Sequence, residues 1–310
     1  MDDPKFSELP LEIVRYILLQ GARSRDGMVF AARCMRLSTW IRQWIAPTLY
    51  HTVDIWTETQ AASFAEALEQ TRFGVSLRSL VRSLTIKTTA FAAYDTQHTK
   101  SRMHPLMEAG SFTPIGATSL SVMKILRILT DEQEPGLQEV CIPMALMATK
   151  RTPVLSIDLP RSVTITGIDG LVWSAYGWDN VTHVRLTSYN PNFHETKWFL
   201  RLPSLTHFAF AFYYEMPLGL RIAEEMTASP QLKCLVMVVY PPSNDPRGKL
   251  VARQNKEALL KLDEPNLVVW ESNPKAIDRF EDVESNRFWK HVDEIVEKQR
   301  AEKAAALAMP

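Results

Sequence analysis

A six-residue pattern recurs along most of the chain and constrains its fold more than any other feature of the sequence. The pattern is an apolar residue, two variable residues, an apolar residue, one variable residue and an apolar residue. It occurs at 50–55, 81–86, 137–142, 160–165, 181–186, 205–210 and 232–237, and residues 266–270 look like a last strand out of phase. From residue 137 onward, successive copies start 23, 21, 24 and 27 residues apart.

Each copy predicts a short strand whose apolar residues face the core, because side chains alternate between the two faces of a strand. The intervening segments 60–70, 119–130, 218–228 and 255–262 have apolar residues at helical spacing. Strands in one phase that alternate with helices predict an α/β fold with a parallel sheet. Their interval is typical of an irregular leucine-rich-repeat solenoid. A non-repetitive α/β domain is the alternative, since one copy of so short a pattern arises easily.

Two helical patterns precede the repeats. The first has apolar residues at spacings of four, which places them on one stripe of a helix, and its members are Leu9, Ile13 and Ile17. Pro10 falls in the first turn of this helix, where its missing N–H would have no partner. The second pattern spans residues 31–45 and is expected to stop at Pro47.

The residues of this N-terminal region occur in an order that resembles the F-box, the helical module that docks substrate adaptors onto the Skp linker of cullin-type ubiquitin ligases. The matching residues are Leu9-Pro10-Leu11-Glu12-Ile13, then Cys34, Ser38, Trp40 and Arg42, and finally Leu49-Tyr50. The resemblance covers residues 8–50, although Arg33-Cys34-Met35-Arg36 replaces the usual Val-Cys-Lys run. It implies that Leu9, Pro10, Ile13 and Ile17 contact a Skp-type linker and, through it, a cullin.

With the repeats that follow, the chain resembles a fungal-type F-box protein with degenerate leucine-rich repeats. Three parts are expected: an F-box-like helical module at 5–50, a degenerate repeat domain at 51–280, and a C-terminal capping helix with a frayed tail at 281–310. The implied function is that of a substrate-recognition adaptor of a ubiquitin ligase. The alternative is a repeat-protein scaffold with no ligase role, whose N-terminal hairpin only caps the solenoid.

The charge balance and the cysteine content bear on the partners and the compartment of the protein. Its 35 basic and 35 acidic residues balance, so no electrostatic attraction to nucleic acid or anionic lipid is expected. The three cysteines are Cys34, Cys141 and Cys234, a sparse and odd set that is neither a disulfide framework nor a zinc site. Neither a signal sequence nor an apolar run long enough for a membrane span is found. We therefore expect a cytoplasmic or nuclear location.

Sequence motifs for catalysis are missing. The chain has no glycine-rich phosphate loop, no His-Glu-x-x-His, no paired Cys-x-x-Cys and no Gly-x-Ser-x-Gly. The prediction is a non-enzymatic protein that needs no cofactor and no metal.

The repeat pattern itself predicts a binding surface. The variable positions beside the middle apolar residue of each strand should line the concave face of the sheet and contact a substrate protein, through Glu139, His183, Arg185 and His207. Because neighbouring strands lie about 4.8 Å apart, the two histidines should be side by side. They form either a metal-binding or pH-sensitive patch or, in the simpler interpretation, part of a partner surface. Tyr213 and Tyr214, after the sixth strand, and the long segment 88–118 are further candidate contacts.

Overall fold

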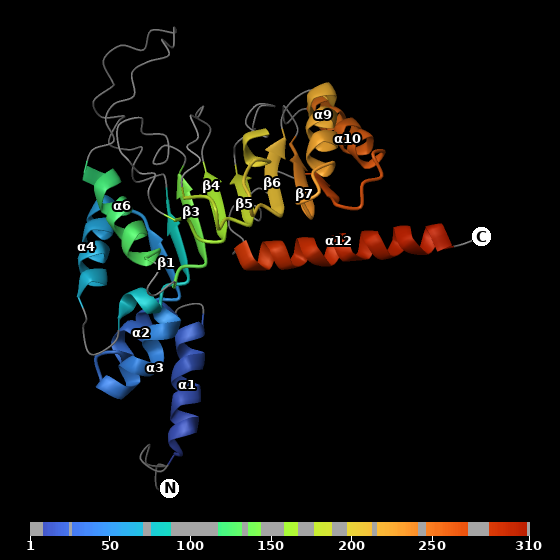
Figure 1. Ribbon diagram of the computed structural model, residues 1–310. Coiled ribbons are helices and arrows are strands. Elements are labelled where there is room, and N and C mark those ends of the chain that lie inside the picture. Colours follow the sequence, from blue (N-terminus) through green and yellow to red (C-terminus); the bar gives the residue numbers. More distant parts are fainter. Residues whose placement is uncertain are drawn as a thin grey trace. The chain divides into compact units, whose positions relative to one another are not determined.

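The computed structural model shows an α/β chain whose eight strands form an open parallel sheet in the order β1-β2-β3-β4-β5-β6-β7-β8 (Figure 1). It describes residues 9–24, 27–70, 76–87, 117–131, 136–143, 158–166, 177–187, 197–212, 216–240, 246–271 and 285–308. The chain divides into two compact units, Met1–Gln138 and Glu139–Pro310. Each unit is described by itself below.

All eight predicted strands are present. The first unit contains β1 (Thr52–Ile55) and β2 (Ser83–Ile86), and the second contains β3 (Glu139–Pro143), β4 (Ser162–Thr166), β5 (His183–Thr187), β6 (His207–Phe212), β7 (Cys234–Val239) and β8 (Leu267–Glu271). The middle apolar residues of the repeats pair across the sheet, as Val163 with Val184 and Val184 with Phe208 show. The repeat pattern therefore predicted both the strands and their register.

Three short helices open the first unit: α1 (Leu11–Arg23), α2 (Gly27–Cys34) and α3 (Thr39–Leu49). The single helix expected over 31–45 is wrong, because the chain breaks between α2 and α3. Ser38 starts the new helix by accepting a hydrogen bond on its side-chain oxygen from the Ile41 N–H, at 3.2 Å. Pro47 does not stop α3, which continues to Leu49. Pro47 has no N–H to donate to the carbonyl four residues earlier, so α3 continues past it with one intrahelical hydrogen bond fewer.

The three helices share a small core of their own. Its buried members are Ala22, Ala31, Cys34, Ile41 and Ile45. Two glycines let α1 and α2 approach closely. A Cβ atom on Gly21 would lie 2.5 Å from the ring of Phe30, and one on Gly27 would lie 2.2 Å from the carbonyl oxygen of Ala22. Gly27 is the stricter of the two positions, because it faces backbone atoms, whereas Gly21 faces a side-chain ring.

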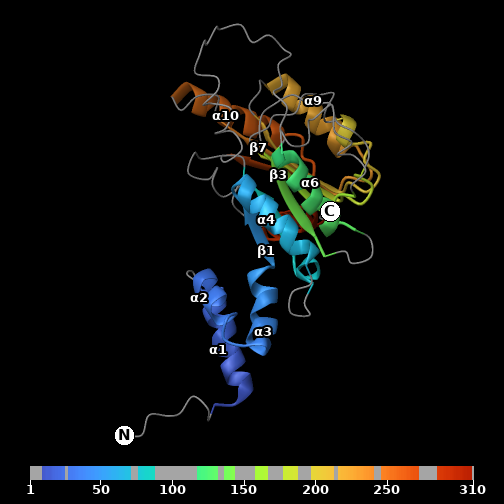
Figure 2. The same ribbon diagram turned by 90° about the vertical axis from the view of Figure 1, so that its left-hand side faces the viewer.

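The rest of the first unit surrounds β1 and β2. Helix α4 (Glu58–Glu69) packs against α6 (Ala117–Leu129), and both contact the 3-10 helix η2 (Leu77–Ser79) (Figures 1 and 2). Thr57 and Gln60 form a capping box at the start of α4, which is why this helix begins there. Most of the 88–118 segment lies outside the described residues.

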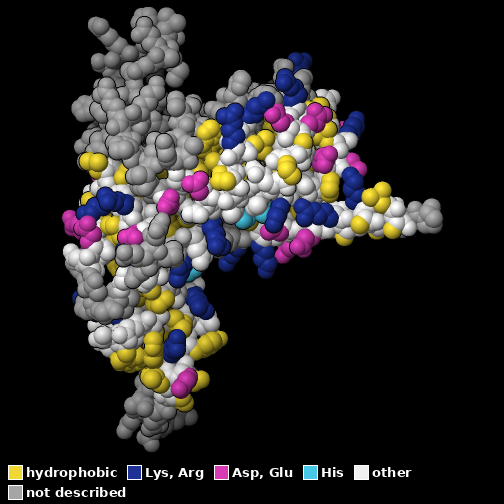
Figure 3. Space-filling model, in the orientation of Figure 1, with side chains coloured by type: hydrophobic (Ala, Val, Ile, Leu, Met, Phe, Trp, Pro, Cys, Tyr) yellow, Lys and Arg dark blue, Asp and Glu magenta, His cyan; other side chains and the backbone are white. Residues whose placement is uncertain are grey.

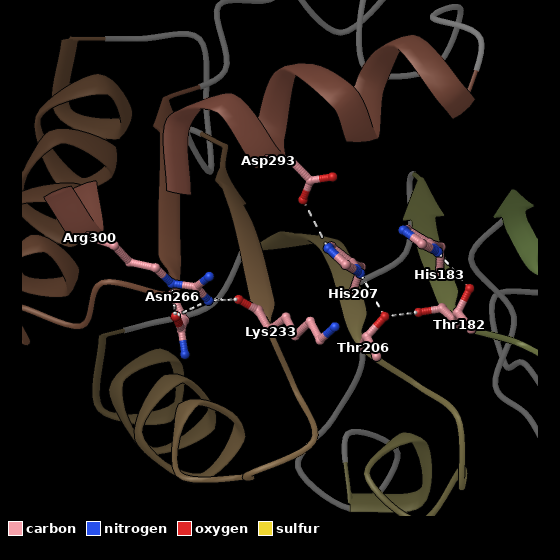
Figure 4. A network of polar contacts seen from close by, with 8 residues as sticks. All are labelled: Thr182, His183, Thr206, His207, Lys233, Asn266, Asp293 and Arg300. Carbon is pink, nitrogen blue, oxygen red and sulfur yellow. Dashed lines mark hydrogen bonds and ion pairs between the residues drawn. The ribbon is translucent and has the colours of Figure 1, made fainter. Parts of the chain in front are cut away.

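In the second unit, helices lie against both faces of the sheet. Helices α9 (Met216–Thr227) and α10 (Pro246–Leu260) contact β7 and β8, across the sheet from α12 (Ser285–Ala308) (Figure 4). α12 was expected to cap the open end of the sheet, and that expectation is wrong. Its apolar side chains pack instead across the face of β6, β7 and β8. The helix continues to Ala308, so the tail expected to fray after residue 300 is helical here, and its fraying stays a prediction.

Candidate functional site

An apolar surface runs along α1 and the start of α2 in the first unit. The members predicted to contact a linker are exposed, with 41% of Leu9, 45% of Ile13 and 45% of Ile17 open to solvent, and Pro10 is exposed as well. The structure adds further exposed apolar residues on α1 and α2, namely Tyr16, Met28, Val29 and Phe30. We call this set the α1–α2 face. Figure 3 shows hydrophobic side chains gathered over these N-terminal helices.

The α1–α2 face exists because α1 uses only one of its two apolar stripes for packing. Ala22 is buried in the three-helix core and Leu18 packs against it. The adjoining stripe of Ile13 and Ile17 points away from that core and stays in solvent. Exposed apolar patches larger than scattered single residues mark sites of interaction with proteins or membranes. The start of α2, Met28-Val29-Phe30, was missed in the sequence because those three consecutive apolar residues fit no single stripe.

A second notable cluster centres on two histidines in the second unit. His183 of β5 pairs in register with His207 of β6, so they lie side by side, as the repeat register predicted. Their rings stack with centroids 4.2 Å apart and an angle of 7° between the planes. Thr182 and Thr206 each place a hydroxyl oxygen 2.7 Å from the Nδ1 atom of the following histidine. The two threonines therefore hold both rings in the same orientation.

Helix α12 completes this cluster from above the sheet (Figure 4). Asp293 Oδ1 lies 2.9 Å from His207 Nε2. Because a carboxylate can only accept, Nε2 of His207 carries the proton of this bond. The indole of Trp289 meets both imidazoles edge-on, with ring centroids 5.1 Å from His183 and 5.6 Å from His207. We call Thr182, His183, Thr206, His207, Trp289 and Asp293 the histidine network.

Burial keeps the imidazoles of this network neutral. Burial, and then the neighbouring positive charge that His207 would carry, lower the pKa of His183 to about 3. Burial also lowers the pKa of His207, while Asp293 opposes that shift by its charge and its hydrogen bond. Next to His207 in the register, burial raises the pKa of the Cys234 thiol to about 12. At neutral pH these three side chains are therefore uncharged.

The residues predicted to contact a substrate are mostly covered. Only 8% of Glu139, 3% of Arg185 and 8% of His207 is exposed, and His183 is half-buried. Their expected exposure on an open concave face is therefore wrong. The Arg185 guanidinium lies 5.0 Å from the ring centre of Phe288, and its Nε donates to the hydroxyl of Thr164 at 3.2 Å. Tyr213 and Tyr214 lie outside the described residues.

The sequence contains a pattern that indicates the packing of α12 on this face of the sheet, and the sequence-based prediction did not use it. At β6, β7 and β8 the outward positions are apolar rather than polar, as in Ala209, Ala211, Val236, Val238 and Val268. Such a strip would not stay in water if another apolar element could cover it. The amphipathic stripe of α12 is that element, through Phe288, Trp289, Val292 and Val296. Reading the two stripes together would have placed the helix on the sheet.

Within the described part of the chain, no group of three or more His, Cys, Asp or Glu side chains is arranged to hold a metal ion. No helix among the described residues is both long and apolar enough to cross a membrane. Comparisons of the chain with protein-family models, with curated proteins and with solved structures find no match.

Proposed function

We propose that this chain is a non-enzymatic substrate-recognition adaptor of a Skp-cullin-F-box ubiquitin ligase. In this proposal α1 to α3 are an F-box-like module that binds a Skp-type linker, and through it a cullin. The strands and helices that follow are a degenerate leucine-rich-repeat domain that binds a substrate protein.

The observation that carries the proposal is the exposure of the α1–α2 face. If the N-terminal hairpin only capped a repeat scaffold, Leu9, Ile13 and Ile17 would be buried against the residues that follow. They are instead among the more exposed large apolar residues of the described chain. Burying such a side chain from full exposure gains about 1.5–3 kcal/mol, and since these three are already more than half-buried, covering the remainder gains roughly half of that or less for each. A partner that covers this stripe therefore has a substantial driving force for binding.

An adaptor of this kind does no chemistry of its own. It raises the effective concentration of substrate lysines beside the loaded conjugating enzyme, since it binds the linker and the substrate at once. The nearly complete burial of the expected contact residues on the sheet matters for this role. The substrate must bind another surface, or bind after α12 has moved.

The proposal is tested by capture of the full-length chain on a purified Skp-type linker. The linker should retain the wild type and should bind Leu9→Ala/Pro10→Ala at least tenfold more weakly. The double variant Ile13→Ala/Ile17→Ala should show a similar loss, because a few buried apolar contacts carry most of the affinity of an interface.

A matched control is available on α10. Leu250 and Leu260 are exposed leucines of similar size, 56% and 50% open to solvent, and they lie in the second unit. Leu250→Ala/Leu260→Ala should bind the linker like the wild type. Failure of the linker to retain the wild type would refute the adaptor proposal and favour the scaffold. Equal retention of wild type and α1 variants would show that the α1–α2 face is not the contact.

A further inference from the structure

Helix α12 is held on the sheet by an interface that satisfies only part of its polar groups. The indole Nε1 of Trp289 and the side-chain oxygen of Gln299 are buried in the described structure without a hydrogen-bond partner. A buried polar group left without a partner costs about 1–3 kcal/mol. Both atoms would regain hydrogen bonds to water if the helix left the sheet. Apolar contacts favour the docked helix, and these two atoms favour its release.

The contacts of α12 differ along its length. Near its N-terminal end it rests on the histidine network and on Arg185, whose guanidinium lies over Phe288. Toward its C-terminal end, Arg300 donates to the Asn266 side chain at 2.7 Å and to the Lys233 carbonyl at 2.9 Å (Figure 4). Lys303 also forms an ion pair with Asp263 at 2.9 Å. The histidines therefore contact the end of the helix that carries Phe288 and Trp289.

We propose that α12 is a releasable cover over the sheet face of β5 to β8, and that proton uptake by the histidine network, chiefly at His183, releases it. The stacked rings leave no room between them for water, and Trp289 closes them from above. A proton taken up by either neutral ring would place a desolvated positive charge in this stack, and protons on both rings would place two such charges at a centroid separation of 4.2 Å. Undocking of α12 gives water access to the rings, so that solvent can hydrate and screen these charges.

The charged and titratable groups around the rings support His183 as the main site. On β6, His207 is its stacked neighbour, and on the far side of His207 lies the neutral thiol of Cys234. On α12, Asp293 bonds to His207 and Arg300 places positive charge near that ring, as does Lys233, which directly precedes β7. Ser162 and Glu139 continue the row beyond His183 on β4 and β3, and Arg185 lies two residues along the same strand. Among the described residues, His183 has a hydroxyl and no carboxylate as its hydrogen-bond partner.

The direction of the pH effect follows from these contacts. With the helix docked, burial and His207 hold the pKa of His183 near 3, whereas a histidine in water titrates near 6.5. The docked state is therefore fully favoured above about pH 6.5 and is progressively lost as the pH falls from there toward 3. Within that window the equilibrium shifts toward release by about tenfold for each pH unit.

This inference is independent of linker binding, and only its consequence for a substrate rests on the adaptor proposal. Release uncovers the apolar strip of β6 to β8, on the face where the repeat pattern predicts a binding surface. In the adaptor, α12 would then compete with the substrate for the same strands.

Hydrogen exchange of the full-length chain, measured by mass spectrometry at pH 7.5 and pH 5.5, tests the proposal. The quantity compared is the protection factor, which corrects for the intrinsic effect of pH on exchange. For the segment around Val292 and Val296 it should fall about tenfold at the lower pH, while the strands β6 and β7 keep their protection. In His183→Asn, which cannot take up a proton, the fall should be less than threefold.

The same substitution at His291 is the matched control, since this histidine lies on α12 and its side chain is 66% exposed. His291→Asn should keep the tenfold response. An equal response in His183→Asn and wild type, or no response in wild type, would refute the proposal. A parallel loss of protection in β6 and β7 would refute it as well, because it would indicate unfolding of the whole unit instead of release of one helix.

Discussion

Helices α1 and α12 carry the same kind of apolar stripe and use it in opposite ways. In α1, Ile13 and Ile17 are four residues apart and exposed, whereas in α12, Val292 and Val296 are four residues apart and buried. The difference lies in what each helix meets. Strands β6 to β8 offer α12 an apolar strip, and no described residue covers the corresponding stripe of α1. Periodicity predicts a helix and its apolar side, but the complementary surface decides whether that side is a core or a docking face.

The largest expected effect of burial beneath α12 is on the reactivity of a cysteine thiol. Cys234 lies beneath α12, where burial raises its pKa to about 12, whereas Cys141 is only half-buried. At pH 8 the Cys234 thiol should react with iodoacetamide on the order of a thousandfold more slowly than an ordinary thiol, because only the thiolate attacks. Mass spectrometry of labelled peptides measures the rates. Rapid labelling of Cys234 with the chain otherwise folded would mean that the cover is open most of the time.

A charge introduced on each stripe should have very different effects on stability. Val292→Asp places a carboxylate in the buried interface and should lower the free energy of unfolding by about 3 kcal/mol, an effect limited by the option of releasing α12. Ile13→Asp, on the exposed stripe, should change it by less than about 0.5 kcal/mol. Urea denaturation followed by tryptophan fluorescence compares the two. A similar loss in both variants would mean that α1 is covered in solution.

The α1–α2 corner offers a smaller test of how tightly the docking module is built. Gly27→Ala should destabilise the three helices by about 2 kcal/mol, because its Cβ would meet the backbone oxygen of Ala22. Gly21→Ala should be close to neutral, since the ring of Phe30 can turn aside and alanine favours the helix by about 1 kcal/mol. Circular dichroism during thermal unfolding distinguishes them. Equal effects would argue against the close α1–α2 approach.

The smallest effect concerns the start of α3. Ser38→Ala removes the side-chain oxygen that accepts from Ile41 N–H and should cost about 1 kcal/mol, while Ser38→Asp keeps an acceptor and should cost little. The same unfolding measurement applies. If both variants were equally destabilised, the serine would matter for packing and its capping role would be secondary.

Much of the fold could be predicted because the strands are short and repeated. Period-2 patterns located all eight strands, and their common phase gave the parallel register in which His183 meets His207. The break between α2 and α3 was missed because it depends on one residue, the serine that caps α3. The apolar residues keep helical spacing across the break, and that longer pattern favoured a single helix. The expected stop at Pro47 was wrong by two residues, because a proline lacks one donor but does not by itself prevent the next residues from keeping helical angles.

The candidate sites were only partly predictable, for a different physical reason. Leu9, Ile13 and Ile17 belong to one helix, so their shared stripe is a local property that the sequence contains directly. The cover of the sheet joins His207 to Asp293, which is 86 residues away, and local patterns do not encode such a pairing. In the sequence, the packing of α12 on the sheet was indicated locally by apolar residues at outward strand positions, such as Ala209 and Val236. The contact of Trp289 with the two imidazoles is also long-range in sequence, so no local pattern predicted it.

The strand order of the sheet also bears on how the chain folds. Because every strand lies beside its neighbours in sequence, most long-range contacts join segments only a few tens of residues apart, as the pairing of His183 with His207 shows. Pairing of strands that are near in sequence closes short loops, which lowers the entropy cost of forming each pair. Helix α12 adds a longer connection to this sheet, since His207 and Asp293 are 86 residues apart.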